Sequence, residues 1–457
     1  MNLIPARLSL ETYQDSEPFL AVQTDNPRIM VASAHTPNNV FSTGNAPIYF
    51  SNDGGDTWNL ENTLPVEQIT CDVTVAIPTG QNHAQGDTHA AALGCNYNLP
   101  FPDSSTLYEA ETANPLSGMT MSIQSSRGKI DQPFVQARTI SNEDRIYVGV
   151  NDFNRPKTGP TATLDVSFDG GVTFKSISLD KRKTPYNAPP VRLATAADKT
   201  VYVAFFGDWQ FQPGGTSATL DLVVVRDDVG GNEANPFQAL KDPFDNLAGR
   251  MVVRKLTIPW KPTVPTMGQE RIGANLSLAV NPNNSSDVYI GWGDQAGDGN
   301  IYTLHVRRST DRGVTWSSSD LPNTTLRNAI NIAIAVADNG VVGLLYQQFT
   351  NDRWVTHLVQ SQNAFTTFRD TILATVPASE PTLVALPYLG DYDCLSSIGN
   401  EFRGVFSANN TPDLANFPSG VKYQRSADFN KRILTDEHGN SVPISIDPFY
   451  FSVPVIP

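Results

Sequence analysis

SNDGGDTW, residues 51–58, is an octapeptide that recurs in variant form further along the chain. Residues 167–174 read SFDGGVTF and residues 309–316 read STDRGVTW, so all three copies fit S-x-D-x-G-x-T-[W/F]. Each copy follows a segment of alternating apolar residues, such as residues 301–306, and a period of two indicates a β-strand. The Asp of the pattern can accept backbone hydrogen bonds within a turn, and Gly permits backbone angles that a Cβ disfavours. The repeat therefore predicts a series of similar β-hairpin turns.

Weaker copies and paired strands fill the rest of the chain. Residues 361–368, SQNAFTTF, keep the Ser, the Thr and the aromatic residue, with Asn in place of Asp. Upstream of the turns, a short apolar strand precedes a strand rich in β-branched and aromatic residues, as in residues 145–150 and 287–292. Repeats of roughly 40–50 residues with four strands each are typical of β-propellers. The predicted repeats begin near Glu17, Asp87, Asp131, Arg192, Arg271, Asn331 and Asp391.

The sequence therefore predicts an all-β fold, a single β-propeller of four-stranded antiparallel blades that spans residues 1–457. Seven blades are expected, and six are the alternative if the least regular unit, residues 87–128, is an insertion. The 32 Gly and 33 Pro suit many short strands joined by turns. Residues 444–453 are expected to form a closing strand, and either this strand or the N-terminal residues 6–10 would complete the last blade.

The octapeptides resemble the Asp boxes, or BNR repeats, of sialidase-like β-propellers. The resemblance implies that each box joins the third and fourth strands of a blade, on the face away from the ligand site. It therefore implies a structural role for Asp53, Asp169 and Asp311. The resemblance does not reach the catalytic motifs, because the Arg-Ile-Pro motif of true sialidases is missing from this sequence. We therefore do not expect true sialidase activity.

Metal binding is the functional alternative for the turns. Residues 52–56 are rich in side-chain oxygen, which calcium prefers, but the distal Glu of an EF-hand loop is missing. The three cysteines match no zinc pattern. We therefore expect neither a metal nor a cofactor.

Charge and cysteine content limit the partners and the compartment. A net charge of −14 disfavours nucleic acid as a partner, and no apolar run is long enough to span a membrane. Cys71 and Cys95 could form a disulfide across neighbouring strands, or all three cysteines could be buried free thiols. We expect an extracellular or periplasmic protein whose leader is absent from this sequence, with a cytoplasmic protein as the alternative. Self-assembly or a larger complex stays open.

Candidate site residues were sought on the loops opposite the octapeptide turns, since binding sites gather on variable loops over a rigid scaffold. The candidate catalytic residues are Asp87, His89, Asp131, Asp391 and Tyr392. The candidate substrate-binding residues are Arg192, Arg271, Arg353, Trp292 and Trp209. Capping of loops by the acids and packing of the Trp side chains are the structural alternatives.

These residues suit a carbohydrate-active protein that takes an acidic glycan containing uronate or sialate. Arginine binds a carboxylate by paired hydrogen bonds. Hydrolysis needs two carboxyl groups beside the scissile bond, whereas uronate elimination needs a base such as His89 or Tyr392. The sequence favours a hydrolase or lyase and leaves the choice between them open. The alternative is a non-catalytic module that binds glycans, adheres or forms part of a larger assembly.

Overall fold

The structure is a computed structural model. It describes residues 1–8, 15–35, 45–65, 69–79, 87–96, 98–114, 120–154, 159–182, 186–260, 267, 270, 272–295, 302–382 and 388–457. These residues form an almost entirely β structure, in which strands and turns alternate throughout. The all-β prediction is confirmed.

The strands of the described residues form eight antiparallel sheets, six with four strands and two with three. Each four-stranded sheet is built from strands that follow one another in the chain. The first three are β1 Ser16–Val22, β2 Met30–His35, β3 Asn45–Ser51 and β4 Asn59–Pro65; β5 Ile69–Ala76, β6 Thr88–Cys95, β7 Ser105–Thr112 and β8 Ser122–Gly128; and β9 Ile130–Ile140, β10 Glu143–Asp152, β11 Thr161–Ser167 and β12 Lys175–Ser178. The next three are β13 Ala188–Thr195, β14 Val201–Phe211, β15 Ser217–Asp227 and β16 Arg250–Pro259; β17 Leu276–Asn281, β18 Asn284–Gln295, β19 Tyr302–Ser309 and β20 Leu326–Arg327; and β21 Ala329–Val336, β22 Val342–Thr350, β23 Arg353–Ser361 and β24 Arg369–Pro377.

The two three-stranded sheets come last in the chain. They are β25 Cys394–Ile398, β26 Glu401–Asn409 and β30 Ile446–Pro454, and the small sheet β27 Ser426–Asp428, β28 Ile433–Thr435 and β29 Ser441–Val442. A short 3₁₀ helix, Leu414–Asn416, precedes the small sheet. Asn2 pairs with Phe449 along the outer edge of β30, so the start of the chain lies against its last strand.

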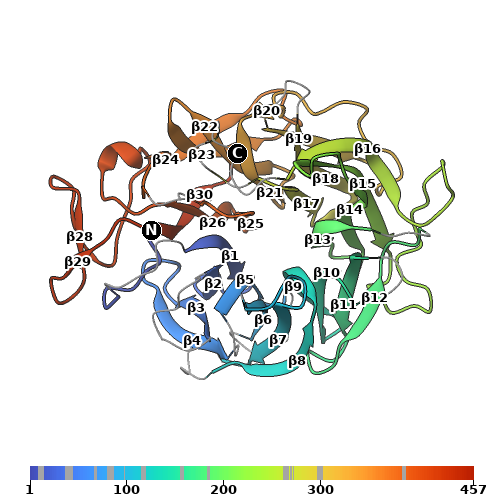
Figure 1. The fold of residues 1–457 in the computed structure, drawn as a ribbon, viewed down its shortest axis with the longest axis horizontal. Coiled ribbons are helices and arrows are strands. Elements are labelled where there is room, and N and C mark those ends of the chain that lie inside the picture. The colour runs from blue at the N-terminus through green and yellow to red at the C-terminus, as the bar shows by residue number, and fades with distance from the viewer. Residues whose placement is uncertain are drawn as a thin grey trace.

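The sheets stand in a ring with their first strands toward the centre (Figure 1). Each inner strand contacts the inner strand of the next sheet, and β25 contacts β1, which closes the ring. The small sheet β27–β29 projects from the edge of the ring (Figure 1). The arrangement is that of a β-propeller, as predicted.

The expected beginnings of the repeats can be compared with the inner strands. The beginnings expected near Glu17, Asp131, Asn331 and Asp391 lie at or just before inner strands β1, β9, β21 and β25. The expectation near Asp87 was wrong, because Asp87 precedes β6, the second strand of its sheet, and the inner strand is β5. The alternating pattern of residues 88–95 is shared by first and second strands, and so does not distinguish between them.

The core lies between neighbouring sheets, and this explains why many strands are apolar on both faces. Along β14, Val203 and Phe205 pack in a cluster with residues of the β9–β12 sheet. Tyr202 and Phe206, which alternate with them, pack in a cluster with residues of the β17–β20 sheet. Because successive side chains point to opposite faces, a strand buried on both faces reads as a continuous apolar run.

The octapeptide turns share one hydrogen-bond pattern. The first turn is typical: Ser51 Oγ donates to Asp53 Oδ1 at 2.9 Å and accepts from Gly55 N at 2.9 Å, and Thr57 N donates to Asp53 Oδ1 at 3.0 Å. The turns at 167–174 and 309–316 repeat these contacts. In the fourth turn Asn363 accepts from Thr367 N at 2.9 Å, so the Asn substitution preserves the geometry. Every one of these turns joins the third and fourth strands of its sheet.

Replacing Asp169 by Ala is expected to destabilise the fold by about 1–2 kcal/mol, because the turn loses hydrogen bonds that its backbone cannot replace. Burial alone would raise the pKa of Asp169, but the hydrogen bonds from Thr173 and Ser167 outweigh burial and hold the pKa below its ordinary value. Urea unfolding measures the loss. Ligand binding per folded molecule should be unchanged, and a stable variant with selectively lost function would contradict the structural role.

Candidate functional site

A pocket of about 620 Å³ opens at the centre of the ring, where the inner strands begin. The octapeptide turns lie at the other end of the strands: Gly54 N donates to Arg28 O between β1 and β2, and Gly170 N donates to Asp144 O at the β9–β10 hairpin. The pocket is therefore on the face opposite the turns. Its charged and titratable lining residues are Glu17, His35, Asp72, Asp131 and Asp391.

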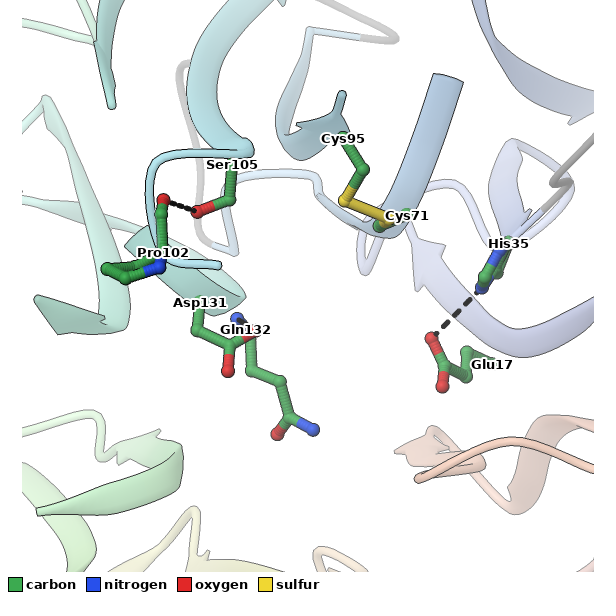
Figure 2. Close-up of a disulfide and its surroundings, with 8 residues drawn as sticks. All are labelled: Glu17, His35, Cys71, Cys95, Pro102, Ser105, Asp131 and Gln132. Atoms are coloured by element: carbon green, nitrogen blue, oxygen red, sulfur yellow. Dashed lines mark hydrogen bonds and ion pairs between the residues drawn. A yellow bond between two sulfur atoms is a disulfide. The ribbon is translucent and has the colours of Figure 1, made fainter. Parts of the chain in front are cut away.

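β-Bulges at the beginnings of the inner strands aim these side chains at the pocket. The pairing with the second strand shifts by one residue in β1, β5, β9 and β21, and by two residues in β13. The displaced positions include Glu17, Asp72 and Gln132, and a bulge re-aims a side chain in this way. Glu17 (φ 55°) and Gln132 (φ 44°) have positive φ, which is costly for residues other than Gly and occurs mainly at functional sites. Figure 2 shows Glu17 of β1 and Asp131 and Gln132 of β9 extending toward the pocket that all three line.

The segment before β25 is held against the start of β1. Gly390 has a φ of 100°, and a Cβ there would lie 2.6 Å from Glu17 N, so only Gly fits. Asp391 N donates to Glu17 Oε1 at 3.2 Å, and Leu389 N donates to Glu270 Oε2 at 2.7 Å. Two buried glutamates therefore fix the backbone that carries Asp391.

A chain of hydrogen bonds crosses the pocket floor. Tyr388 Oη lies 2.5 Å from Glu17 Oε1 and 2.9 Å from Asp391 Oδ1. Gln132 Nε2 donates to Asp391 Oδ2 at 2.9 Å, and Arg192 Nη2 donates to Gln132 Oε1 at 3.4 Å. A phenol carries one proton, so it cannot donate fully to two carboxylates at once. The Tyr388 hydroxyl therefore links Glu17 to Asp391.

Asp72 is the most strongly perturbed acid of the pocket. Burial raises the pKa of Asp72 well above its ordinary value. The negative charges of Glu17, Asp131 and Asp391 raise this pKa further, whereas the guanidinium of Arg192 lowers it. Asp72 Oδ1 is buried without a hydrogen-bond partner. Burial thus favours the protonated form of Asp72 beside other carboxyl groups, and a difference in environment of this kind can separate an acid from a base.

A disulfide joins the strand that carries Asp72 to its neighbour. Cys71 in β5 bonds to Cys95 in β6, and both line the pocket (Figure 2). The bond lies at the bulge of β5, directly before Asp72, and so restrains the backbone that aims this side chain. Of the alternatives left open by the sequence, the structure has the disulfide, with Cys394 as the buried free thiol.

Denatured, unreduced protein is expected to contain one titratable thiol, Cys394, against three after reduction. The Cys71–Cys95 loop spans a sequence separation of 24, and closing such a loop stabilises a fold by about 3 kcal/mol. Thiol titration gives the count, and urea unfolding of the double variant C71S/C95S gives the stability loss. Cys394→Ser serves as the control for thiol removal. Three free thiols without reductant would contradict the bond.

The candidate residues predicted from the sequence are partly brought together. Asp131 and Asp391 line the pocket. Arg192 and Tyr392 lie beneath it, with the Arg192 guanidinium 5.2 Å from the Tyr392 ring, and both line a second cavity of about 590 Å³ at the other end of the axis. Tyr392 and Arg192 therefore support the floor rather than face the opening.

Asp87 and His89 do not reach the pocket, contrary to expectation. A Cβ at Gly171, in the second octapeptide turn, would lie 3.0 Å from His89 Nδ1, so His89 is on the turn face. Burial lowers the pKa of His89 to about 4 and favours a neutral ring. The prediction failed because Asp87 was taken to precede an inner strand, whereas it precedes β6. This strand is antiparallel to the inner strand β5 and therefore begins at the opposite face.

Three further candidates fall elsewhere. Arg353 lies at the outer strands, where its guanidinium donates to Asn416 Oδ1 at 2.6 Å. Trp292 is buried in the core, stacked on His305 with ring centroids 5.1 Å apart. Arg271 lies outside the described residues, as does the histidine at position 83. Arg192 and Arg353 therefore do not line the pocket, and their prediction as substrate-binding residues there was wrong.

Trp209 lies on the pocket face but beside the opening. Its ring is 5.1 Å from that of Trp260, which lines the pocket. Gly207–Gln210 is a register irregularity between β14 and β15, and it turns Trp209 toward this edge.

The sequence analysis missed Asp72 and Tyr388 and did not select Glu17 or Gln132. One signal was present: Pro follows Glu17 and Gln132 inside strands, and Pro within a strand is confined to edges, first positions and bulges. Asp72 has no such signal, because it is preceded by Cys71 and followed by Val73 in a strand of ordinary pattern.

Comparisons with known proteins concern the fold. No family model matches the sequence, and no curated protein matches it. An ulvan lyase of polysaccharide lyase family PL25 has a TM-score of 0.51 and 12% identity, over 86% of this chain and 92% of that chain. An α-L-arabinofuranosidase of Fusarium graminearum has a TM-score of 0.46 and 10% identity, over 84% and 99%. An α-L-arabinanase of Penicillium chrysogenum has a TM-score of 0.45 and 11% identity, over 98% of each chain. At these identities the likeness is one of fold.

No helix in the described part of the chain is long and apolar enough to cross a membrane. Within the same residues, no group of three or more His, Cys, Asp or Glu side chains is arranged to hold a metal ion.

Proposed function

We propose that the protein is a glycoside hydrolase whose active site is the central pocket opposite the octapeptide turns. The observation that carries the proposal is the meeting of Asp72 of β5, Asp131 of β9 and Asp391, just before β25, in one pocket with Glu17. Glycoside hydrolysis needs one carboxyl group that gives a proton and another that is ionised. A pocket in which one acid is buried and others are hydrogen-bonded and open to solvent meets this need.

Asp72 is the proposed general acid. Its burial and the surrounding carboxylates keep it protonated, so it can give a proton to the oxygen of the leaving sugar. Asp391 is the proposed nucleophile or base. Hydrogen bonds from Gln132 and Tyr388 hold both of its oxygens, and it is more exposed than Asp72. Glu17 and Tyr388 are positioning residues, because they fix the segment that carries Asp391.

A neutral glycan suits the described pocket better than the acidic glycan that the sequence suggested. Among the described residues that line the pocket there is no Lys or Arg. Carboxylates would repel a uronate or a sialate, and Arg192 is occupied with Gln132 on the far side of the floor. An acidic substrate would need a cation from another part of the chain, for which Arg271 is the candidate.

The test is digestion of one neutral and one acidic polysaccharide, linear arabinan and ulvan, by wild type and Asp391→Asn. Release of reducing ends from the neutral polymer by wild type alone would support the proposal. Unsaturated uronate products from ulvan, seen by ultraviolet absorbance, would overturn it in favour of a lyase. Tight binding of both polymers with no product from a wider panel of neutral glycans would overturn it in favour of a binding module.

Seven blades and an Asp-box identity for the octapeptide turns are also proposed. Six blades would be the four-stranded sheets, and the seventh would be β25, β26 and β30, completed by the paired residues at Asn2. The small sheet β27–β29 would then be an insertion in the last blade. Four turns with one hydrogen-bond pattern support the identity.

An oxidising compartment is proposed from the Cys71–Cys95 bond, because disulfides persist mainly outside the reducing cytosol. This agrees with action on a polymer that is too large to enter a cell.

A further inference from the structure

Four aromatic side chains form a contiguous patch beside the pocket, here termed the aromatic platform: Tyr186, Trp209, Phe211 and Trp260. Trp209 is its centre. The Trp209 ring centroid lies 5.5 Å from that of Tyr186, 5.0 Å from that of Phe211 and 5.1 Å from that of Trp260. The residues come from the start of β13, the end of β14 and the end of β16, which all lie on the pocket face.

The platform is open to solvent. Tyr186 is 41% exposed and Phe211 is 49% exposed, while Trp209 and Trp260 are partly buried. Single exposed apolar side chains are common, but a contiguous group of large aromatic ones marks a binding surface. Trp209 and Trp260 also pack against the buried cluster of the β13–β16 sheet, whereas the exposed part of the platform comes mainly from Tyr186 and Phe211.

The backbone around the platform is shaped to hold these rings. A Cβ at Gly159 would lie 2.3 Å from the Tyr186 ring, so Gly is needed beneath it. Asp208, with a φ of 53°, sits in the irregularity of β14 that turns Trp209 to this edge. Trp260 packs on Gly273, where a Cβ would be 3.8 Å from its ring. Backbone of this kind indicates a fixed surface rather than a chance cluster.

Trp260 connects the platform to the pocket. It lines the pocket together with Gly273, and its other side faces Trp209. A chain bound in the pocket and leaving it over β14 would therefore cross Trp260 and then Trp209.

The surface fits sugar rings. One face of a sugar ring presents C–H groups, which pack on an aromatic ring, while hydroxyl groups at the edge stay in water. Polar side chains at the margin, Asp208 and Gln210, are exposed and could meet those hydroxyls. A purely apolar partner would leave these groups without water.

We propose that the aromatic platform is a second subsite that binds sugar residues of a glycan chain extending outward from the central pocket. This rests on the proposed function, and makes the preferred substrate a polymer or a long oligosaccharide rather than a disaccharide.

The test uses linear arabinan and shorter arabino-oligosaccharides as probes. Binding is measured by titration calorimetry on Asp391→Asn, with Trp209→Ala or Phe211→Ala added. The affinity for the polymer is expected to fall about tenfold with Trp209→Ala, since a stacked aromatic contact contributes roughly 1 kcal/mol or more. The affinity for the disaccharide should not change. Phe244→Ala is the matched control, because Phe244 is 75% exposed in the connection between β15 and β16, away from the platform.

Folding of each variant is checked by its thermal midpoint, and the exposed Phe211 provides a second variant if Trp209→Ala is unstable. Equal affinity of Asp391→Asn and its Trp209→Ala form for the polymer would overturn the subsite. So would failure of the polymer to bind Asp391→Asn at all. Loss of polymer binding in Trp209→Ala would support the subsite even if wild type released no product from arabinan or from a wider panel of neutral glycans. The latter result would overturn the hydrolase alone, so the two proposals fail separately.

Discussion

Asp391→Asn is expected to lower the rate of glycan hydrolysis by about a thousandfold, with its unfolding free energy within about 1 kcal/mol of wild type. The Asn side chain keeps an oxygen that can accept from Gln132 or Tyr388, so the local packing is retained. It cannot attack the sugar or take a proton. Loss of a positioned acid or base costs roughly 10²–10⁴-fold in rate.

Asp72→Asn should lower the rate of hydrolysis by a similar factor, and it should also change how the rate depends on pH. Because burial raises the pKa of Asp72, the acid stays protonated well above the usual range, and activity should fall as pH rises through that pKa. In the Asp72→Asn variant, the low remaining activity should no longer fall as pH rises through this range.

Asp169→Ala is the matched control for these two variants, since it removes a carboxylate from the opposite face, and its rate per folded molecule should equal that of wild type. Hydrolysis by Asp391→Asn or Asp72→Asn at the wild-type rate would rule out the assigned roles.

Most of the fold could be predicted because its signal is local and repeated. The Ser, Asp, Gly and Thr of each octapeptide are joined by hydrogen bonds to one another, so eight consecutive residues determine the turn. The copy at 361–368 shows that Asn can replace Asp without loss of the pattern. The small sheet β27–β29 has no such repeat and was not predicted.

The site could be predicted less well because it depends on strand order and on bulges. Asp131 is at the beginning of an inner strand and Asp391 precedes one, and both line the pocket. Asp87 precedes a second strand, so the same type of residue at the same type of boundary lies on the other face. Asp72 lies within a strand, and the bulge beside Cys71 sets the direction of its side chain. No local sequence pattern predicted this bulge.

A buried ion pair between Arg425 and Asp447 lies where the two ends of the chain meet, and both side chains are completely buried. Arg425 Nη2 lies 2.5 Å from Asp447 Oδ2 and 3.0 Å from Asn2 Oδ1, and Asn2 Nδ2 donates to the same carboxylate at 2.7 Å. The pair thus joins the start of the chain to the segment before β27 and to the last strand, β30.

Arg425→Met should destabilise the protein by about 3–5 kcal/mol, because Asp447 then keeps a buried charge without its partner. The double variant R425M/D447N should recover much of the loss, since it removes the charge as well. Lys431→Met is the control: its ion pair with Asp428 is largely exposed, and such pairs contribute little. Urea unfolding of the four proteins gives the comparison. A loss for Arg425→Met no larger than for Lys431→Met would mean that the ring closes without the pair, through the backbone hydrogen bonds between the start of the chain and β30 and the contact of β1 with β25.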